Sequence, residues 1–215
     1  KNILNYMREY LSPLGDVAPV QGISGSAAQE EGLRPVPVQR ERNVLLETAC
    51  QKADFVFNLA GVNRPKNQEE FMQGNFGFAS MLLDTLKKYH NICPVMLSSS
   101  IQATMVGRYA GSEYGKSKKA GEELFFSYAA ETGAKVLVYR FPNLFGKWCR
   151  PNYNSAVATF CNNTANDLPI TVNDRATELE LLYIDDLVEE MLDALEGKPH
   201  RCDYDGLTPV FHDSG

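Results

Sequence analysis

Short apolar segments alternate with long helical segments through the middle of the chain, and this alternation constrains the fold more than any other feature of the sequence. Residues 54–59, 95–99 and 135–140 have the length and apolar character of buried strands. Longer amphipathic stretches over residues 68–89 and 114–132 lie between them. Strands that alternate with helices form crossover units in a parallel sheet covered on both faces. The sequence therefore predicts an α/β fold with a doubly wound parallel sheet.

Further elements are expected on both sides of this central region. We predict a helix over 1–11, a loop over 12–34, a strand over 36–38, a helix capped by Asn43, a helix over 155–166, extended segments over 170–172 and 178–184, and a helix from Asp185 or Asp186 to Glu196. No internal repeat accompanies these elements.

The composition is typical of a soluble globular protein and argues against several classes of function. The 215 residues are 22% charged and 44% hydrophobic, with a net charge of -6. This charge argues against nucleic acid or an anionic membrane as the main partner, and no apolar run approaches the roughly 18 residues of a membrane span. The five cysteines form no CxxC pair and the three histidines are far apart. We therefore expect reduced thiols, a cytoplasmic protein and no metal site.

Hydroxyl, phenol and amine groups follow one another between residues 95 and 118. The second strand ends in Ser98, Ser99 and Ser100, and the following helix begins with Tyr114 and Lys118. Residues four apart share a helix face, so we expect the Lys118 ammonium near the Tyr114 hydroxyl. A nearby cation favours the phenolate and lowers the pKa of a tyrosine from its usual value of about 10. This pattern predicts proton transfer near neutral pH, with a serine holding the substrate oxygen.

Small or polar residues follow each of the three expected strands. Ala60 and Gly61 follow the first strand, the serines end the second, and residues 141–143 follow the third. Open α/β sheets bind their ligands beyond the carboxyl ends of the strands. We therefore expect these residues to line one ligand-binding edge.

With these motifs the chain resembles the extended short-chain dehydrogenases/reductases of the NAD-dependent epimerase/dehydratase family. The matching segments are Asn58–Gly61, Asn75, Ser98–Ser100, Tyr114–Lys118, Arg140–Gly146 and Tyr183–Asp186. The segments NLAGVNRP, SSSIQAT and RFPNLFGKWCRPNYNS, together with residues 172–186, are similar to the reductase domain of bacterial capsular-polysaccharide assembly proteins that make UDP-N-acetyl-L-fucosamine precursors.

The resemblance implies a Rossmann-like fold and an NADPH-dependent reductase, with NAD as the alternative cofactor. The implied substrate is a UDP-linked 4-keto-6-deoxy-N-acetyl-hexosamine, used for capsular or surface polysaccharide. Residues 1–145 then form the dinucleotide-binding part. Residues 146–215 form a small C-terminal substrate-binding lobe that is interwoven with it.

The resemblance also implies the roles of individual residues. Tyr114 protonates the sugar C4 oxygen, Lys118 stabilises the phenolate and binds the nicotinamide ribose, and Ser100 holds the substrate oxygen. Ser99 competes with Ser100 for that role. Asn75 completes the catalytic set by bonding backbone and placing a water behind Lys118, or it is a buried helix residue satisfied by main chain. The implied cofactor-binding residues are Arg40, Leu59, Ala60, Gly61, Ser98, Tyr114, Lys118, Phe141, Pro142, Asn143 and Leu144. The implied substrate-binding residues are Ser99, Ser100, Asn143, Asn152, Tyr153, Asn154 and Arg175. Arg175 clamps the diphosphate of the substrate or belongs to a surface ion pair.

One departure from the family concerns the cofactor pyrophosphate. The family begins with a strand and a Gly-x-x-Gly-x-x-Gly turn, and that motif is missing from the 215 residues. Residues 1–4 resemble the start of the helix that follows this turn, so we expect the first strand and turn to be missing from this chain. Arg40 then follows the second strand, where it binds the NADP 2′-phosphate or is a solvated loop residue.

The two long helices over 68–89 and 114–132 predict a homodimer. They carry more apolar residues than one buried stripe needs, and Phe125, Phe126 and Tyr128 are examples. Extended reductases pair these two helices across a dimer axis as a four-helix bundle, so the resemblance implies the same interface here.

Three other functions compete with the reductase. A dehydratase of this family carries an Asp-Glu pair after its catalytic hydroxyl, whereas Ile101, Gln102 and Ala103 follow Ser100. A nucleotide-sugar epimerase uses the same tyrosine and serine with cycling of a bound cofactor. A cofactor-free binding module has no evident need for the Tyr114 and Lys118 pair.

Overall fold

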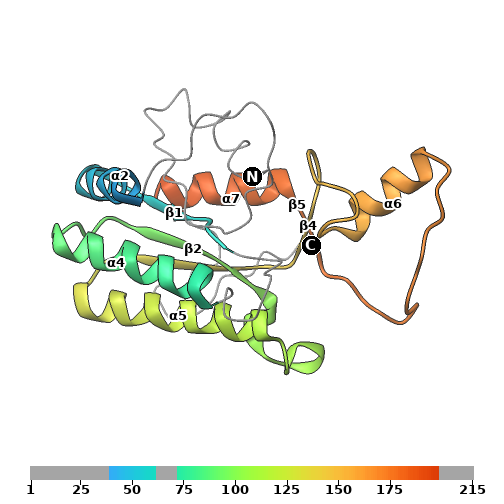
Figure 1. The fold of residues 1–215 in the computed structure, drawn as a ribbon, viewed down its shortest axis with the longest axis horizontal. Coiled ribbons are helices and arrows are strands. Elements are labelled where there is room, and N and C mark those ends of the chain that lie inside the picture. The colour runs from blue at the N-terminus through green and yellow to red at the C-terminus, as the bar shows by residue number, and fades with distance from the viewer. Residues whose placement is uncertain (1–38, 62–71, 199–215) are drawn as a thin grey trace. The chain divides into compact units, whose positions relative to one another are not determined.

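The computed structural model describes residues 39–61 and 72–198, which belong to two units (Figure 1). The larger unit comprises residues 17–140 and 202–210, and the smaller unit comprises residues 1–16, 141–201 and 211–215. The helix predicted over 1–11, the loop over 12–34 and the strand over 36–38 lie outside the described residues. The assignment of one part to the cofactor and another to the substrate stays a prediction.

The larger unit contains the three strands that the sequence predicts. They are β1 (Val56–Asn58), β2 (Val95–Ser100) and β3 (Val136–Phe141), in the order β1-β2-β3. β1 pairs in parallel with β2, with Val56 opposite Val95. All six residues of β2 are buried, as expected for a strand of a parallel sheet that is covered on both faces.

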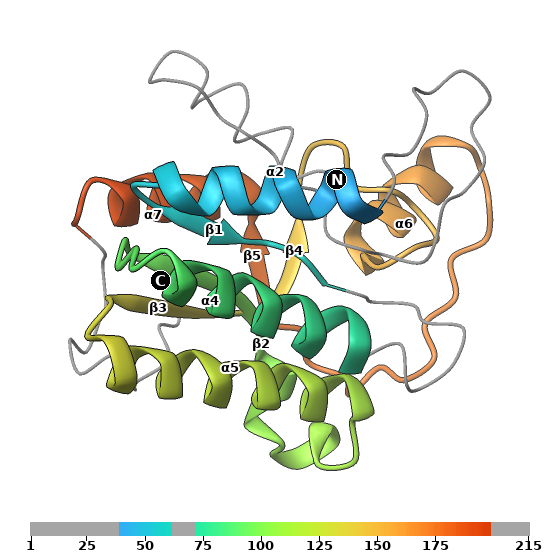
Figure 2. The ribbon, with the colours of Figure 1, turned by 60° about the vertical axis from the view of Figure 1, so that its left-hand side comes forward.

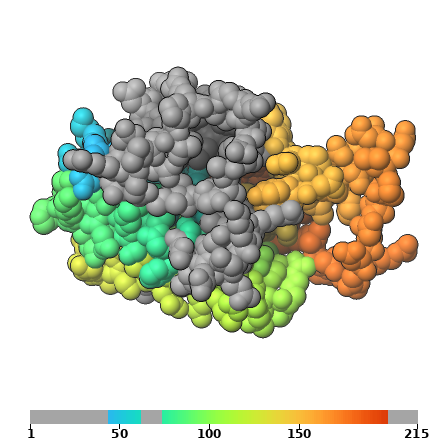
Figure 3. All heavy atoms as spheres, in the orientation of Figure 1, coloured from blue at the N-terminus to red at the C-terminus, as the bar shows by residue number. Residues whose placement is uncertain are grey.

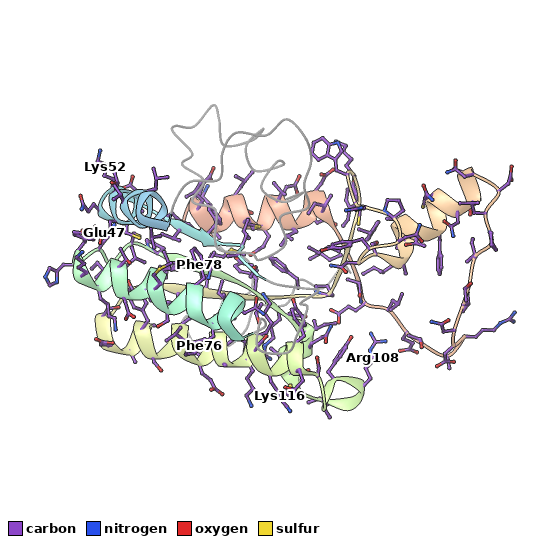
Figure 4. The ribbon with its side chains drawn as sticks, in the orientation of Figure 1. Glu47, Lys52, Phe76, Phe78, Arg108 and Lys116 are labelled. Carbon is purple, nitrogen blue, oxygen red and sulfur yellow. The ribbon has the colours of Figure 1, made fainter. Side chains whose placement is uncertain are left out.

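Three helices pack around one core in the larger unit. In both ribbon views α4 (Phe78–Lys88) lies between α2 (Gln39–Lys52) and α5 (Glu113–Thr132) (Figures 1 and 2). Lys88 of α4 and Glu47 of α2 form an ion pair of 2.7 Å that joins the two helices. Glu47 is labelled in Figure 4. The core includes Leu46, Cys50, Leu83, Leu86, Val95, Leu97, Phe125, Tyr128, Val136 and Val138.

The ends of the helices differ in part from the prediction. α2 begins at Gln39, so the prediction that Asn43 caps it is wrong. The described part of the helix predicted over 68–89 begins as a π-helix, η2 (Met72–Gly77), and continues as α4. α5 begins after Ser112, whose hydroxyl accepts a hydrogen bond from the Gly115 amide at 2.9 Å. It ends at Gly133, which has a left-handed φ of 73°.

The smaller unit contains a pair of parallel strands and two helices. The strands are β4 (Asn143–Phe145) and β5 (Leu181–Tyr183), and the helices are α6 (Ala156–Ala165) and α7 (Ile184–Leu195). The prediction of an extended segment over 170–172 is wrong, because residues 166–180 include no strand and are exposed. The segment predicted over 178–184 is shorter in the structure, because the chain turns into α7 at Ile184.

The described cysteines are free thiols. Cys50 and Cys93 are buried, Cys149 is half-buried and Cys161 is exposed. Within the described ranges, no three His, Cys, Asp or Glu side chains are grouped so that they could hold a metal ion. Among the helices of these ranges, none has both the length and the apolar character needed to cross a bilayer.

Candidate active site

Three serines stand at the carboxyl end of β2, where the sequence predicts a ligand-binding edge. Ser98, Ser99 and Ser100 are all buried. After Ser100 the chain turns into a short 3-10 helix, η3 (Ile101–Thr104). The Ser100 hydroxyl caps this helix by accepting a hydrogen bond from the Gln102 amide at 3.3 Å. The serines thus lie where a strand passes into a loop, the usual place for a ligand in an open α/β sheet.

Ser99 and Ser100 differ in what their hydroxyls contact. The Ser99 hydroxyl donates to Glu122 Oε1 at 2.5 Å. The Ser100 hydroxyl is hydrogen-bonded with the Tyr114 hydroxyl. Of the two serines that compete for the substrate oxygen, Ser100 therefore has its hydroxyl beside the candidate proton donor, and Ser99 is engaged with a carboxylate.

Tyr114 lies in the first turn of α5 and is half-buried. Burial raises the pKa of Tyr114 to about 12, and the hydrogen bond with Ser100 offsets only part of this effect. The expectation that this pKa is lowered is therefore wrong, because burial of the phenol outweighs the favourable contact. At neutral pH the side chain is a neutral phenol that carries a proton to donate.

Lys118 lies one helical turn after Tyr114, as the spacing predicts, and only 6% of it is exposed. Its ammonium group donates to the Ser98 carbonyl oxygen at 2.9 Å and lies 5.7 Å from the centre of the Tyr114 ring. Burial lowers the pKa of Lys118 to about 8, while the charge of Glu122 acts in the opposite direction. Lys118 therefore stays mostly protonated at pH 7 and loses its proton at mildly alkaline pH.

Gly61 and Asn75 approach Lys118 from two other segments. A Cβ at Gly61 would lie 3.1 Å from Lys118 Nζ and 3.2 Å from Asn75 Oδ1, so this position suits a residue without a side chain. Asn75 lies in the π-helix η2 and donates to the Ser117 hydroxyl at 3.0 Å. Ser117 in turn donates to the Tyr114 carbonyl oxygen at 2.8 Å, which connects η2 to the first turn of α5.

The remaining predicted residues of the larger unit are Leu59, Ala60 and Arg40. Leu59 and Ala60 follow β1 and are half-buried, and the Ala60 amide donates to Asn58 Oδ1 at 3.2 Å. Arg40 is the second residue of α2, and its side chain lies outside the described part of the structure.

Four of the predicted ligand-binding residues lie where the chain enters the smaller unit after residue 140. Phe141 ends β3, Pro142 follows it, and Asn143 and Leu144 belong to β4; all four are half-buried. The side-chain amide of Asn143 donates to the Glu180 carbonyl oxygen at 3.1 Å. The cofactor and substrate contacts predicted for these residues stay predictions.

The predicted UDP-binding residues are exposed in turns of the smaller unit. Asn152, Tyr153 and Asn154 precede α6, and the Arg150 guanidinium lies 5.7 Å from the centre of the Tyr153 ring. Arg175 is exposed in the segment between α6 and β5. Their role as a diphosphate- and uridine-binding group also stays a prediction.

The sequence interpretation missed a hydrogen-bonded connection between η3 and α5. The Ser112 hydroxyl donates to Gln102 Oε1 at 2.7 Å, and the main-chain amide of Gln102 donates to the Ser100 hydroxyl at 3.3 Å. This connection holds the residue after Ser100 against the N-terminal end of the helix that carries Tyr114. The interpretation also missed Glu122, although Glu122 follows Lys118 by one helical turn and shares its buried face.

A sheet of parallel strands, a serine at a strand end, and a tyrosine and lysine one helical turn apart define a Rossmann-like protein of the short-chain dehydrogenase/reductase type. The chain belongs to the NAD dependent epimerase/dehydratase family, whose sequence model matches residues 24–204. The family and the fold class predicted from the motifs are thereby confirmed.

Individual relatives also agree with the resemblance to the reductase domain of capsular-polysaccharide assembly proteins. The chain is 42% identical over 172 residues to a UDP-2-acetamido-2,6-beta-L-arabino-hexul-4-ose reductase from Pseudomonas aeruginosa, with 80% of this chain and 45% of the relative covered. It is 47% identical to the crystal structure of the capsular polysaccharide assembling protein CapF from Staphylococcus aureus, with a TM-score of 0.63 over 78% of this chain and 43% of that one. The chain thus spans less than half the length of these two relatives.

A more distant structure shows the same fold. It is a UDP-glucuronic acid 4-epimerase from Bacillus cereus in complex with UDP-glucuronic acid and NAD. The identity is 22% and the TM-score is 0.60, over 70% of this chain and 52% of that one.

Proposed function

We propose that the protein to which this chain belongs reduces a UDP-linked 4-keto-6-deoxy-N-acetyl-hexosamine with NADPH, as a step in the synthesis of capsular or surface polysaccharide. The observation that carries the proposal is the hydrogen bond between the Tyr114 and Ser100 hydroxyls at the end of β2. The similarity to a reductase of a UDP-linked 4-keto sugar supports the choice of substrate class.

Ser100 and Tyr114 together bind and protonate the carbonyl oxygen of the substrate. The sugar C4 oxygen takes a position within hydrogen-bonding distance of both hydroxyls. As the carbonyl carbon is reduced, negative charge develops on this oxygen, and Tyr114 donates its proton to it. A phenol whose pKa is raised to about 12 is fully protonated at neutral pH, which suits a proton donor.

Lys118 and Gly61 fit the nicotinamide end of a dinucleotide. The bound nicotinamide cofactor supplies the hydride for the reduction. Because Gly61 has no side chain, it leaves room beside Lys118 Nζ and Asn75 Oδ1. Lys118 then binds the ribose hydroxyls and stabilises the phenolate that Tyr114 becomes after it donates its proton. Ser98, Leu59, Ala60, Phe141, Pro142, Asn143 and Leu144 are the further residues that we assign to cofactor binding.

Two finer assignments belong to the same proposal. NADP is the cofactor, with NAD as the alternative, and Arg40 binds the 2′-phosphate. The UDP moiety is bound by Asn152, Tyr153, Asn154 and Arg175 of the smaller unit.

The protonation state of Tyr114 favours reduction over epimerisation. An epimerase begins by removing a proton from the sugar hydroxyl, which needs a tyrosinate. A reductase begins with the protonated phenol, and the raised pKa of Tyr114 keeps it in that form. Elimination by a dehydratase also lacks support, because Gln102 stands among the residues after Ser100 and its side chain accepts a hydrogen bond from Ser112.

Turnover of purified full-length protein tests the proposal. With the 4-keto substrate we expect oxidation of NADPH and formation of the 4-hydroxy sugar nucleotide. UDP-N-acetylglucosamine, which has no keto group, is the matched control and leaves NADPH intact. Isomerisation of a UDP-sugar without net use of NADPH indicates an epimerase instead. Absence of NADPH binding to the full-length protein indicates a cofactor-free binding module.

We further propose that the protein is a homodimer through the helices over 68–89 and 114–132. In the space-filling view the side chains of α4 and α5 lie at the surface of the larger unit (Figure 3). A groove along α4 is lined in part by Phe76 and Met81, and Phe76, Met81 and Phe126 are half-buried. Phe125 and Tyr128 are core residues and do not contribute to this surface. A monomeric mass in light scattering at micromolar concentration would contradict the dimer.

A further inference from the structure

Glu122 is a buried carboxylate that contacts two strands from the middle of α5. Only 2% of this residue is exposed. Its Oε1 accepts hydrogen bonds from the Ser99 hydroxyl of β2 at 2.5 Å and from Arg140 Nε of β3 at 2.8 Å. Its Oε2 accepts a further hydrogen bond from Arg140 Nη2 at 2.6 Å. One side chain of the helix therefore joins the carboxyl ends of two neighbouring strands.

The environment of Glu122 indicates a specific function for its charge. A carboxylate that is removed from water carries a large desolvation cost, which a paired guanidinium and added hydrogen bonds can offset. The forked contact with Arg140 and the bond from Ser99 provide such compensation. Apolar residues of similar volume often replace a buried ion pair without loss of stability. A role in the adjacent site therefore explains the ion pair better than stability does.

Glu122 contacts one residue next to the candidate site and lies one helical turn from another. Ser99 is the neighbour of Ser100 on β2, and Lys118 precedes Glu122 by one turn of α5. The groups that face Lys118 are Tyr114 and Glu122 of α5, the Ser98 carbonyl of β2, Asn75 of η2 and Gly61 after β1. Among the described groups that face Lys118, Glu122 supplies the negative charge. Removing this charge would also leave the Arg140 cation without its carboxylate.

We propose that Glu122 is a positioning residue of the reductase site: its carboxylate aligns the Ser99–Ser100 end of β2 with the helix that carries Tyr114 and Lys118. The charge of Glu122, one helical turn from Lys118, also favours the protonated form of that lysine. The inference rests on the proposed reductase function for its catalytic consequence. The effect of Glu122 on the protonation of Lys118 does not depend on which substrate the protein reduces. Glu122 touches no reacting atom and acts through Ser99 and Lys118.

The first test is Glu122→Gln in the full-length protein, which removes the charge and keeps the shape. Titration of Lys118 is followed by the ¹³Cε chemical shift in protein labelled at lysine, with Lys118→Arg used for assignment. The Lys118 midpoint is expected at lower pH than in the wild type. The rate of substrate reduction is expected to lose roughly tenfold or more in kcat, with a larger loss at pH 8 than at pH 6. Glu123→Gln is the matched control, because it removes the same charge from an exposed neighbouring position and leaves both readouts unchanged.

The second test separates positioning from stability. Glu122→Gln alone leaves Arg140 without its carboxylate and lowers the melting temperature, whereas Glu122→Gln combined with Arg140→Met removes both charges of the pair. We expect the double variant to regain thermal stability without regaining kcat or the Lys118 midpoint. Wild-type kcat and a wild-type Lys118 midpoint in a folded double variant would overturn the proposal.

The outcomes of the two proposals can be told apart. If the wild-type protein does not reduce the keto sugar, the proposed function fails while the Lys118 titration still tests Glu122. If the wild type is active and Glu122→Gln has an unchanged pH profile and Lys118 midpoint, only the role of Glu122 fails.

Discussion

The Lys118 ammonium donates to the main-chain carbonyl of Ser98 at 2.9 Å, so a buried cation is bound to the strand that ends in the candidate substrate-binding serine. This contact fixes the lysine between β2 and α5 and leaves its charge largely out of water. Burial lowers the pKa of Lys118 to about 8, because the charged form loses its hydration. The site therefore holds its cation at the expense of folding free energy.

Lys118→Met is expected to abolish reduction and to stabilise the fold at pH 7. The pKa falls from 10.5 to about 8, which corresponds to roughly 3 kcal/mol of unfavourable burial of the charged form. The lost hydrogen bond to Ser98 offsets part of this gain, so we expect a net increase of about 1–2 kcal/mol in the free energy of unfolding. Urea unfolding monitored by circular dichroism measures it.

The stability that Lys118→Met gains over the wild type should depend on pH. Because the pKa of Lys118 is lower in the folded state, the burial cost is fully present below pH 8 and disappears as the pH rises towards 10.5. The advantage of Lys118→Met should therefore shrink across that interval. The control is Lys116→Met on the same helix, because Lys116 is exposed and pairs with Glu113 at the surface, where we expect a change within about 0.5 kcal/mol. A Lys118→Met protein that is less stable than the wild type at pH 7 would contradict the account.

The rate of reduction is expected to fall as the pH rises through about 8. The ammonium form of Lys118 is the one that stabilises the Tyr114 phenolate, and it loses its proton near that pH. Tyr114 itself stays protonated, since its pKa is raised to about 12. The profile of kcat against pH under saturating NADPH measures the falling limb. Lys118→Arg, whose guanidinium does not titrate, should remove this limb from whatever activity it retains; persistence of the limb in that variant would assign it to another group.

Tyr114→Phe is expected to lose several orders of magnitude in kcat while it retains NADPH binding. The substitution removes the proton donor and its hydrogen bond with Ser100 but keeps the ring in place. Single-turnover reduction measures the rate, and fluorescence titration measures the cofactor affinity. Tyr128→Phe is a matched control on the same helix, because its hydroxyl donates to the Asn91 carbonyl oxygen in the fold core. Turnover of Tyr114→Phe close to that of Tyr128→Phe would remove Tyr114 from the mechanism.

The sequence predicted the parts of this site that depend on local spacing. Tyr114 and Lys118 share a helix face because they are four residues apart, and Ser100 ends a strand because an apolar run precedes it. The parallel sheet follows from the alternation of strands and helices. Each of these inferences needs only the periodicity of the backbone and the apolar pattern.

Features that depend on tertiary contacts could not be predicted in this way. β4 has three residues after Pro142 and exists through pairing with β5, which lies far along the chain. The sign of the pKa shift of Tyr114 depends on burial, which a four-residue spacing does not reveal. The contacts of Glu122 with β2 and β3 likewise require the folded sheet.

Gly115→Ala is expected to destabilise the fold and to lower activity together. A Cβ at this position would overlap with the Gln102 carbonyl oxygen and would lie 3.0 Å from Met105 Sδ. The overlap involves main chain, so the first turn of α5 must move away from η3 at a cost of roughly 1–3 kcal/mol. Because η3 follows Ser100 and the turn carries Tyr114, the same movement separates the two hydroxyls of the site.

Gly121→Ala provides the matched comparison on the same helix. A Cβ at Gly121 meets no described atom within 4 Å, so only the helix propensity changes. Alanine stabilises a helix interior by about 1 kcal/mol relative to glycine, and we expect a gain of that order in the free energy of unfolding with kcat unchanged. Urea unfolding and steady-state reduction by both variants measure the contrast. Equal effects of the two substitutions on stability and on kcat would show that the close approach of Gly115 to Gln102 does not hold the site together.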